Sequence, residues 1–163
     1  MNVVYARQPL AKSIFLAGPT PRDVRAVSSW RPRALQLLKE QGFTGKVFVP
    51  EAEDGGLPPN AYDEQIRWEW EALDQATVVV FWVPRELPLL PAFTTNTEFG
   101  LLAQSGKLLL GYPAEAQKMR YLDRLAQRFH MPIYGDLREL LNAAVARCEA
   151  PYGHVDGSKD IEL

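Results

Sequence analysis

Five short apolar runs alternate with five amphipathic segments along this chain, and that alternation limits its possible folds more than any other feature. The apolar runs, expected to be strands, lie at residues 13–17, 46–49, 77–83, 107–110 and 132–134. The expected helices lie at residues 28–41, 62–74, 94–105, 115–129 and 136–147. Because the runs are continuously apolar, the strands should be buried on both faces. The pattern predicts an α/β fold: a doubly wound, flavodoxin- or Rossmann-like, five-stranded parallel sheet with helices on both faces.

Composition and charge exclude several classes of protein. The 163 residues include 18 Lys and Arg against 20 Asp and Glu, too even a balance for a protein that binds nucleic-acid polymers. The single cysteine, Cys148, cannot form an intramolecular disulfide. Two histidines cannot build a three-histidine metal site, so no metal is expected. No cofactor is expected either. No apolar run is long enough to cross a membrane, and the N-terminus lacks the apolar stretch of a signal peptide. We expect a cytoplasmic protein.

Ligands bind to doubly wound sheets at the carboxyl ends of the strands, so the residues that follow each strand are the first candidates for a site. After the first expected strand come Gly18, Pro19, Thr20 and Arg22. The glycine permits a tight turn, and Thr20 and Arg22 could hold sugar hydroxyls or a phosphate. The segment is neither a Walker loop nor a dinucleotide-binding glycine fingerprint. The alternative is an ordinary strand-ending turn with an exposed arginine.

A glutamate lies on the inward face of the second expected helix. At about 100° per residue, that face contains Tyr62, Ile66, Glu69, Trp70 and Leu73. A buried carboxylate is costly unless it is paired or neutral, so the position of Glu69 needs an explanation. One explanation is a functional site, and the other is a structural ion pair with Arg22 or Arg31.

A second glutamate, Glu98, lies near the start of the helix that follows the third expected strand. It shares the inward face of that helix with Thr94, Leu101, Leu102 and Ser105. A loop with prolines at positions 84, 88 and 91 would bring Glu98 to the carboxyl ends of the strands. The alternative is structural: Thr94 or Thr95 can cap the helix, and Thr95 with Glu98 has the spacing of a capping box.

Five segments carry a resemblance to a known family. They are residues 15–19 (FLAGP), 65–69 (QIRWE), 80–84 (VFWVP), 95–100 (TNTEFG) and 106–107 (GK). In this order and spacing they resemble the nucleoside 2-deoxyribosyltransferase family, as a divergent branch of it, from the first strand to about Tyr121. The resemblance implies a doubly wound α/β fold and cleavage of the N-glycosidic bond of 2'-deoxynucleosides. Members transfer the deoxyribosyl group to another base through a covalent intermediate on a glutamate.

The resemblance also implies roles for individual residues. It matches Glu98 to the nucleophile and Glu69 to the acid that protonates the departing base, with Asp74 as the less favoured match for the acid. Asn96 is expected to contact the sugar. Ala92 stands where other members carry an aspartate, six residues before the nucleophile, so recognition of the sugar hydroxyls should differ in this chain.

Three functions are compatible with this reading. The first is transfer of deoxyribosyl groups between nucleobases, and the second is hydrolysis of deoxynucleosides or their 5'-monophosphates. The third is non-catalytic nucleotide binding, in which Glu98 only holds a ribose through hydrogen bonds. The expected partners are a deoxynucleoside and a free nucleobase.

Trp68 has two expected roles. It is a candidate for stacking on the base, although aromatic residues at helical spacing more often belong to a core. Its side of the helix, opposite the predicted buried face, also offers an apolar contact to a neighbouring subunit. Because relatives complete their sites with groups from a neighbour, we expect a homodimer or a dimer-based oligomer. Each chain should form one domain over residues 1–150, followed by a polar tail at residues 151–163.

Overall fold

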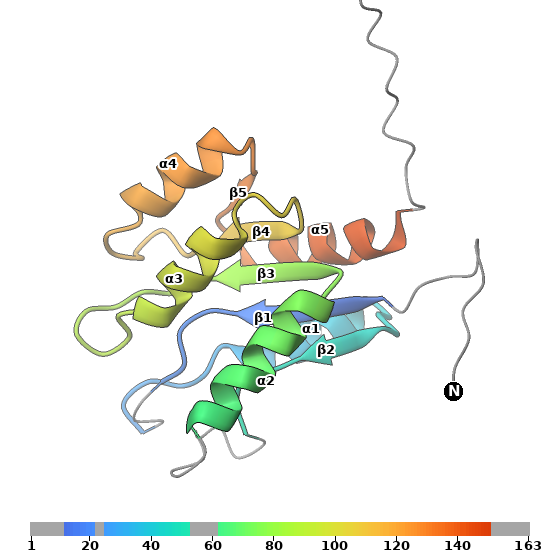
Figure 1. Ribbon diagram of the computed structural model, residues 1–163, viewed down its shortest axis with the longest axis horizontal. Coiled ribbons are helices and arrows are strands. Elements are labelled where there is room, and N and C mark those ends of the chain that lie inside the picture. The colour runs from blue at the N-terminus through green and yellow to red at the C-terminus, as the bar shows by residue number, and fades with distance from the viewer. Residues whose placement is uncertain (1–11, 22–24, 53–61, 151–163) are drawn as a thin grey trace, which may run out of the picture.

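The computed structural model describes residues 12–21, 25–52 and 62–150, and it contains the predicted five-stranded parallel sheet (Figure 1). The strands are β1 (Ser13–Ala17), β2 (Lys46–Phe48), β3 (Val78–Trp82), β4 (Leu108–Gly111) and β5 (Ile133–Tyr134). Their order is β2-β1-β3-β4-β5, and every neighbouring pair is parallel. The prediction of a doubly wound α/β fold is confirmed. The predicted tail at residues 151–163 lies outside the described residues.

The described helices alternate with the strands: α1 (Arg31–Glu40), α2 (Tyr62–Gln75), α3 (Phe93–Leu102), α4 (Arg120–Arg128) and α5 (Leu137–Glu149). Four lie close to their predicted bounds, whereas α4 begins at Arg120 instead of near residue 115. The chain before α4 forms a turn in which the N–H of Ala116 donates to the carbonyl of Pro113 at 2.9 Å. Lys118 then has a φ of 56°. A left-handed residue interrupts a right-handed helix, so α4 starts only beyond it.

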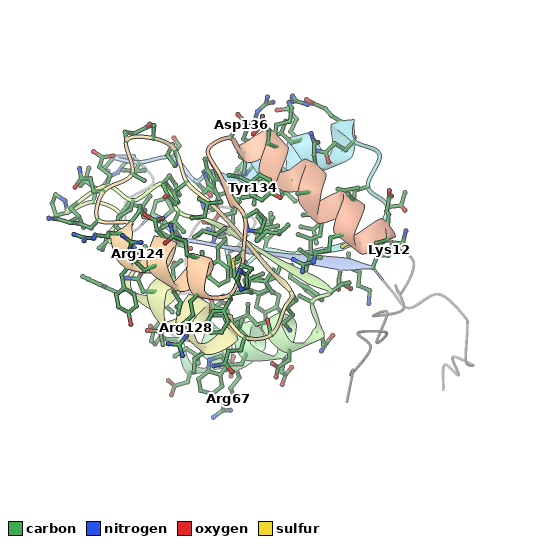
Figure 2. The ribbon with its side chains drawn as sticks, turned by 90° about the horizontal axis from the view of Figure 1, so that it is seen from above. Lys12, Arg67, Arg124, Arg128, Tyr134 and Asp136 are labelled. Atoms are coloured by element: carbon green, nitrogen blue, oxygen red, sulfur yellow. The ribbon has the colours of Figure 1, made fainter. Side chains whose placement is uncertain are left out.

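Successive strand residues point to opposite sides of the sheet, so each strand contributes to two cores. The core between the sheet and helices α1 and α5 includes Ile14, Leu16, Val78 and Val80. The core between the sheet and helices α2, α3 and α4 includes Phe15, Ala17, Val79 and Phe81. Figure 2 shows α1 and α5 on one side of the sheet and the other three helices on the opposite side. Among the described helices, none is long and apolar enough to span a membrane.

The buried arc of α2 differs from the predicted one. Trp70 is 61% exposed, so its predicted place on the inward face is wrong. Leu73, predicted on that face, is buried at 4% exposure, and the small residues Ala72 and the neighbouring Ala76 pack into the same core at 4% exposure each. The predicted face of the helix was inferred from the large apolar residues, so it included Trp70. A helix can approach a sheet more closely through alanines.

The strand order changes direction between β1 and β3, which makes this boundary the switch point of the sheet. Helix α1, after β1, covers one face, and α3, after β3, covers the other. The turn that leaves β1 lies directly against β3: a Cβ added to Gly18 would be 2.1 Å from the carbonyl oxygen of Trp82. Gly18 also has a φ of 150°, which residues with a side chain rarely adopt. Glycine is therefore required where the two strands end side by side.

We expect Gly18→Ala to destabilise the fold by about 3 kcal/mol, because the added methyl group would meet backbone atoms that cannot move away freely. Gly100→Ala is the matched control. An added Cβ at this exposed position of α3 has nothing within 4 Å, and alanine should stabilise the helix by about 0.5–1 kcal/mol. Urea denaturation of both variants measures the two effects. Equal midpoints would contradict the close contact at Gly18.

Candidate functional site

A cavity of about 250 Å³ opens at the carboxyl ends of β1 and β2, between α2 and the start of α3. Figure 1 shows these two helices on the same face of the sheet. Five of the candidate catalytic and substrate-binding residues line the cavity: Gly18, Pro19, Thr20, Glu69 and Glu98. The two carboxyl groups expected to act in chemistry therefore face a common space, at the edge of the sheet where doubly wound proteins bind their ligands.

Glu98 lies in α3, and its position there is not explained by capping. The N-cap residue of α3 is Ala92, which has a left-handed φ of 61° and makes no side-chain capping bond. Thr95 is already the third residue of the helix and is buried, so the capping box of Thr95 with Glu98 is a wrong prediction. The next residue, Phe99, packs edge-on against Phe81 with ring centroids 5.1 Å apart. That core contact holds α3 with Glu98 directed into the cavity.

Glu69 reaches the same cavity from α2. The side-chain amide of Gln65, one turn earlier, donates to Glu69 Oε1 at 2.8 Å. Burial raises the pKa of Glu69, while the Gln65 bond and the charge of Arg31 act in the opposite direction. Among the ion pairs of the described residues, Arg31 is joined to Glu51, so the structural ion pair considered between Glu69 and Arg31 is absent. The other partner considered, Arg22, lies outside the described residues.

The two cavity carboxyl groups are electrostatically coupled. Burial, followed by the negative charge of Glu69, raises the pKa of Glu98 to about 7, and the positive charge of Arg31 opposes the shift. Two carboxylates in a shared, poorly solvated space cannot both ionise easily, so the protons are lost in two separate steps that belong to the pair. Around neutral pH the pair can hold one proton and one negative charge.

A buried ion pair behind the cavity was not predicted. Arg31 is 1% exposed, and its guanidinium binds the carboxylate of Glu51, which also accepts a hydrogen bond from the hydroxyl of Ser29 at 2.8 Å. The N-cap residue of α1 is Trp30, and the hydroxyl of the preceding Ser29 accepts from the backbone N–H of Arg31. The signal for Glu51 was present: it follows β2 at the same edge of the sheet as the other candidates.

Asn96, expected to contact the sugar, is turned toward another group. Its side-chain oxygen accepts a hydrogen bond from Arg85, a buried residue just after β3. Arg85 also donates to the carbonyl of Lys118 at 2.9 Å, so it ties the start of α3 to the loop before α4. Asn96 does not line the cavity. Its observed contact supports the first turn of α3, the helix that carries Glu98.

Two further candidates, Trp68 and Asp74, do not line the cavity. Trp68, predicted to lie opposite the buried face, instead packs its ring against Phe15 and Phe48, with centroids 6.3 and 6.4 Å away, and it remains 40% exposed. Asp74 is exposed near the end of α2, where its carbonyl accepts from the ammonium group of Lys107 at 3.2 Å. Arg22 lies outside the described residues.

The mouth of the cavity is formed partly by two aromatic residues, Tyr62 and Phe93, which are 63% and 70% exposed. Deeper in, the lining is mainly apolar, with Phe15 and Ile66 beside the carboxyl groups. The cavity thus joins a polar, acidic part to apolar surfaces that suit a flat ring. Within the part of the chain that the structure describes, no three His, Cys, Asp or Glu side chains are grouped so that they could hold a metal ion.

Fold and cavity together define a doubly wound α/β protein with a two-carboxyl site at the switch edge of its sheet. A family model described as nucleoside 2-deoxyribosyltransferase like matches residues 11–116, which contain both cavity glutamates. The chain belongs to this nucleoside 2-deoxyribosyltransferase-like family. No curated protein matches the chain. Family membership supports a transferase- or glycosidase-like enzyme that acts on nucleosides.

Ionisation of Glu98 should be coupled to folding. Its pKa of about 7 lies above the ordinary value of 4.5, so its contribution to stability is full below pH 4.5 and is lost as the pH rises through 7. Glu98→Gln, which stays neutral, should therefore be more stable than the wild type at pH 8, on the order of 2 kcal/mol after allowance for solvent screening.

Chemical denaturation at pH 4.5 and pH 8 measures this difference. The gain from Glu98→Gln should be large at the higher pH and small at the lower one. Glu64→Gln is the matched control, because Glu64 is an exposed glutamate of α2. The same gain at both pH values would contradict the burial of an ionisable group at position 98.

Proposed function

We propose that this protein cleaves the N-glycosidic bond of 2'-deoxynucleosides and transfers the deoxyribosyl group to another nucleobase through a covalent ester on Glu98. The observation that carries the proposal is the pair of coupled carboxyl groups, Glu69 and Glu98, facing one cavity. Membership of the nucleoside 2-deoxyribosyltransferase-like family supports the class of substrate. A role in nucleotide salvage and a cytoplasmic location belong to the same proposal.

In the first step, an ionised oxygen of Glu98 attacks the anomeric carbon of the sugar. The bond between this carbon and the base nitrogen breaks through an oxocarbenium-like state, and its electron pair leaves with the base. Glu69 gives the base a proton as it departs, so the base leaves neutral. The products of this step are a free nucleobase, an ionised Glu69 and a deoxyribosyl ester of Glu98.

In the second step, a nitrogen of the acceptor base attacks the anomeric carbon, and the ester bond to Glu98 breaks. Glu69 now acts as a base and accepts the proton that the incoming nitrogen loses. Both carboxyl groups return to their starting state. The same pair thus serves each direction, as microscopic reversibility requires.

The location of the single proton matters for these roles. Burial, followed by the charge of Glu69, raises the pKa of Glu98, which favours the proton on Glu98 before substrate binds. Catalysis needs the proton on Glu69 and the charge on Glu98. A base nitrogen that accepts a hydrogen bond from the Glu69 carboxyl would draw the proton there, so substrate binding itself prepares the nucleophile.

The lining suggests which part of the substrate lies where. The sugar is placed beside the carboxyl groups, within reach of the hydroxyls of Thr20, Thr94 and Thr95. The base is placed against the apolar and aromatic lining toward the mouth, near Phe93. Ala92 also lines the cavity, so the aspartate of other members is replaced here by a small apolar wall, and threonine hydroxyls are the neighbouring groups that can bind the sugar.

Hydrolysis is the second candidate function, and the exposed mouth of the cavity favours it. With Tyr62 and Phe93 more than half exposed, water can reach the glycosyl ester unless another group covers the opening. Attack by water in place of the acceptor base would release free deoxyribose from a nucleoside. The expected dimer or dimer-based oligomer would favour transfer if a neighbouring subunit covers this mouth, and that assembly stays a prediction.

Product analysis tests the transferase and the role of Glu98 together. Purified protein, incubated with a 2'-deoxynucleoside and a different free base, should form a new deoxynucleoside, detected by chromatography. Glu98→Ala and Glu98→Gln should each reduce the rate by at least about 1,000-fold, because neither side chain can form the ester. Glu71→Gln is the control, since Glu71 is exposed on α2.

The outcomes of that assay separate the candidate functions. Release of free base at the same rate with or without an acceptor would replace the transferase by the hydrolase. Loss of turnover in Glu98→Gln with nucleoside binding preserved is expected for a nucleophile. A wild-type protein that binds nucleosides or their 5'-monophosphates without converting them would leave only the non-catalytic binding function.

The rate should depend on pH as a bell-shaped curve, because the pair must hold one proton. kcat/KM should fall as the pair loses that proton above about pH 7, and fall again at acid pH as a second proton binds. Glu69→Gln removes the charge that raises the pKa of Glu98, so the remaining activity should lose its alkaline limb near 7. Measurement of kcat/KM against pH tests this prediction, and Glu71→Gln is the control. If Glu69→Gln kept the alkaline limb unchanged, the limb would belong to the titration of another group.

A further inference from the structure

Arg31 is unusual because its charged side chain is almost completely buried. It is 1% exposed, and it begins α1, which packs on the face of the sheet opposite to α2 and α3. A buried charge costs several kcal/mol unless it is paired and fully hydrogen-bonded. The contacts of Arg31 therefore show what this position accomplishes.

Most of the guanidinium hydrogen bonds go to the chain leaving β1. Nε donates to the carbonyl of Leu16 at 3.0 Å, and Nη2 donates to the carbonyl of Gly18 at 2.7 Å. Nη1 donates to the carbonyl of Pro19 at 3.4 Å and to Thr20 Oγ1 at 3.2 Å. The backbone turn at Gly18, Pro19 and Thr20, which lines the cavity, is thus built around this one planar group.

The remaining strong contact of Arg31 is the ion pair with Glu51, which follows β2. The Glu51 side chain is 4% exposed and is also held by Ser29. Arg31 therefore joins the ends of β1 and β2, the two strands below the cavity, through one side chain. Charge-assisted bonds of this kind are among the stronger hydrogen bonds in proteins, and the fork of an arginine fixes their directions.

The charge of Arg31 also acts on the cavity. Among the described residues, the titratable groups that act on its charge are Glu51 at the end of β2, Glu69 on α2 and Glu98 on α3, and Tyr62 also lines the cavity. Burial lowers the pKa of Arg31, while the three carboxyl groups raise it, so it keeps its positive charge. In return, Arg31 lowers the pKa of both Glu69 and Glu98 against the effect of burial.

We propose that Arg31 is a positioning residue for the reaction: acting from the opposite face of the sheet, it shapes the Gly18, Pro19 and Thr20 wall of the cavity and supplies the positive charge against which a cavity carboxylate can ionise. This role rests on the proposed function, in which Glu98 must carry a negative charge. Arg31 itself does not touch the substrate; it acts through the turn and through the two glutamates.

Two substitutions separate the two parts of this role. Arg31→Gln removes the charge, so the pKa of Glu98, followed by NMR of its side-chain carboxyl carbon in the free protein, should rise by about 1 unit. Arg31→Lys keeps the charge but loses the planar fork, so the titration of Glu98 should change little. Instead, KM should rise about tenfold, the effect of one lost hydrogen bond to a charged group.

Arg33→Gln is the matched control. Arg33 lies on the same helix but is exposed, and its carboxylate partner is Glu40 at 3.8 Å. Its substitution should leave both KM and the titration of Glu98 unchanged. A folded Arg31→Gln variant in which Glu98 titrates as in the wild type would overturn the proposal, as would an equal KM in Arg31→Lys and the wild type.

A measurement on the wild-type protein covers the case in which the substituted proteins do not fold. The Nε–H proton of Arg31 should give a slowly exchanging NMR signal whose position changes as the cavity carboxyl groups titrate near pH 7. A signal that does not respond to pH across this range would overturn the proposal. These titrations need no turnover. If the protein forms no new deoxynucleoside but Glu98 and Arg31 titrate as expected, only the proposed function would be refuted.

Discussion

The arrangement of this protein depends on the burial, among the described residues, of Arg31 and the carboxyl groups of Glu51, Glu69 and Glu98 at a single edge of the sheet. Arg31 forms an ion pair with Glu51, and its positive charge also interacts with the carboxyl groups of Glu69 and Glu98. Within the described part of the chain, Arg31 is the cation that acts on these three carboxyl groups, and one cation in a poorly solvated space cannot stabilise three full negative charges. One carboxyl group therefore keeps its proton near neutral pH, and the site contains an acid and a carboxylate at the same time.

The rest of the fold makes this burial possible. Strands β1 and β3 are apolar on both faces, so their cores hold the strand ends rigidly on both sides. Helix α3 is fixed by Phe99 against Phe81, and the loop before it is tied by Arg85 to the carbonyl of Lys118. Each glutamate is thus carried by a separately anchored helix. Their proximity follows from tertiary packing around the switch point of the sheet.

Much of this could be predicted from the sequence, and the failures have identifiable causes. Continuous apolar runs predicted the sheet, and the rule of strand ends predicted the place of Glu69 and Glu98. The capping role of Thr95 and the start of α4 were wrong because left-handed residues, Ala92 and Lys118, reset the helix boundaries. Backbone conformations of that kind leave no mark in hydrophobic periodicity. The ion pair of Arg31 with Glu51 was not predicted either, because it forms between residues that only the tertiary fold brings together.

The position of Arg31 on α1 also links properties that are usually treated separately. Its helix packs against α5 through a core that contains Leu37, Leu38 and Leu141 and is remote in the fold from the cavity side. Any repacking of that layer that shifts the first turn of α1 also shifts the charge behind the two glutamates. The stability of this layer and, under the proposed function, the pH dependence of the reaction are therefore linked. A substitution between α1 and α5 can change both, with no substitution in the cavity itself.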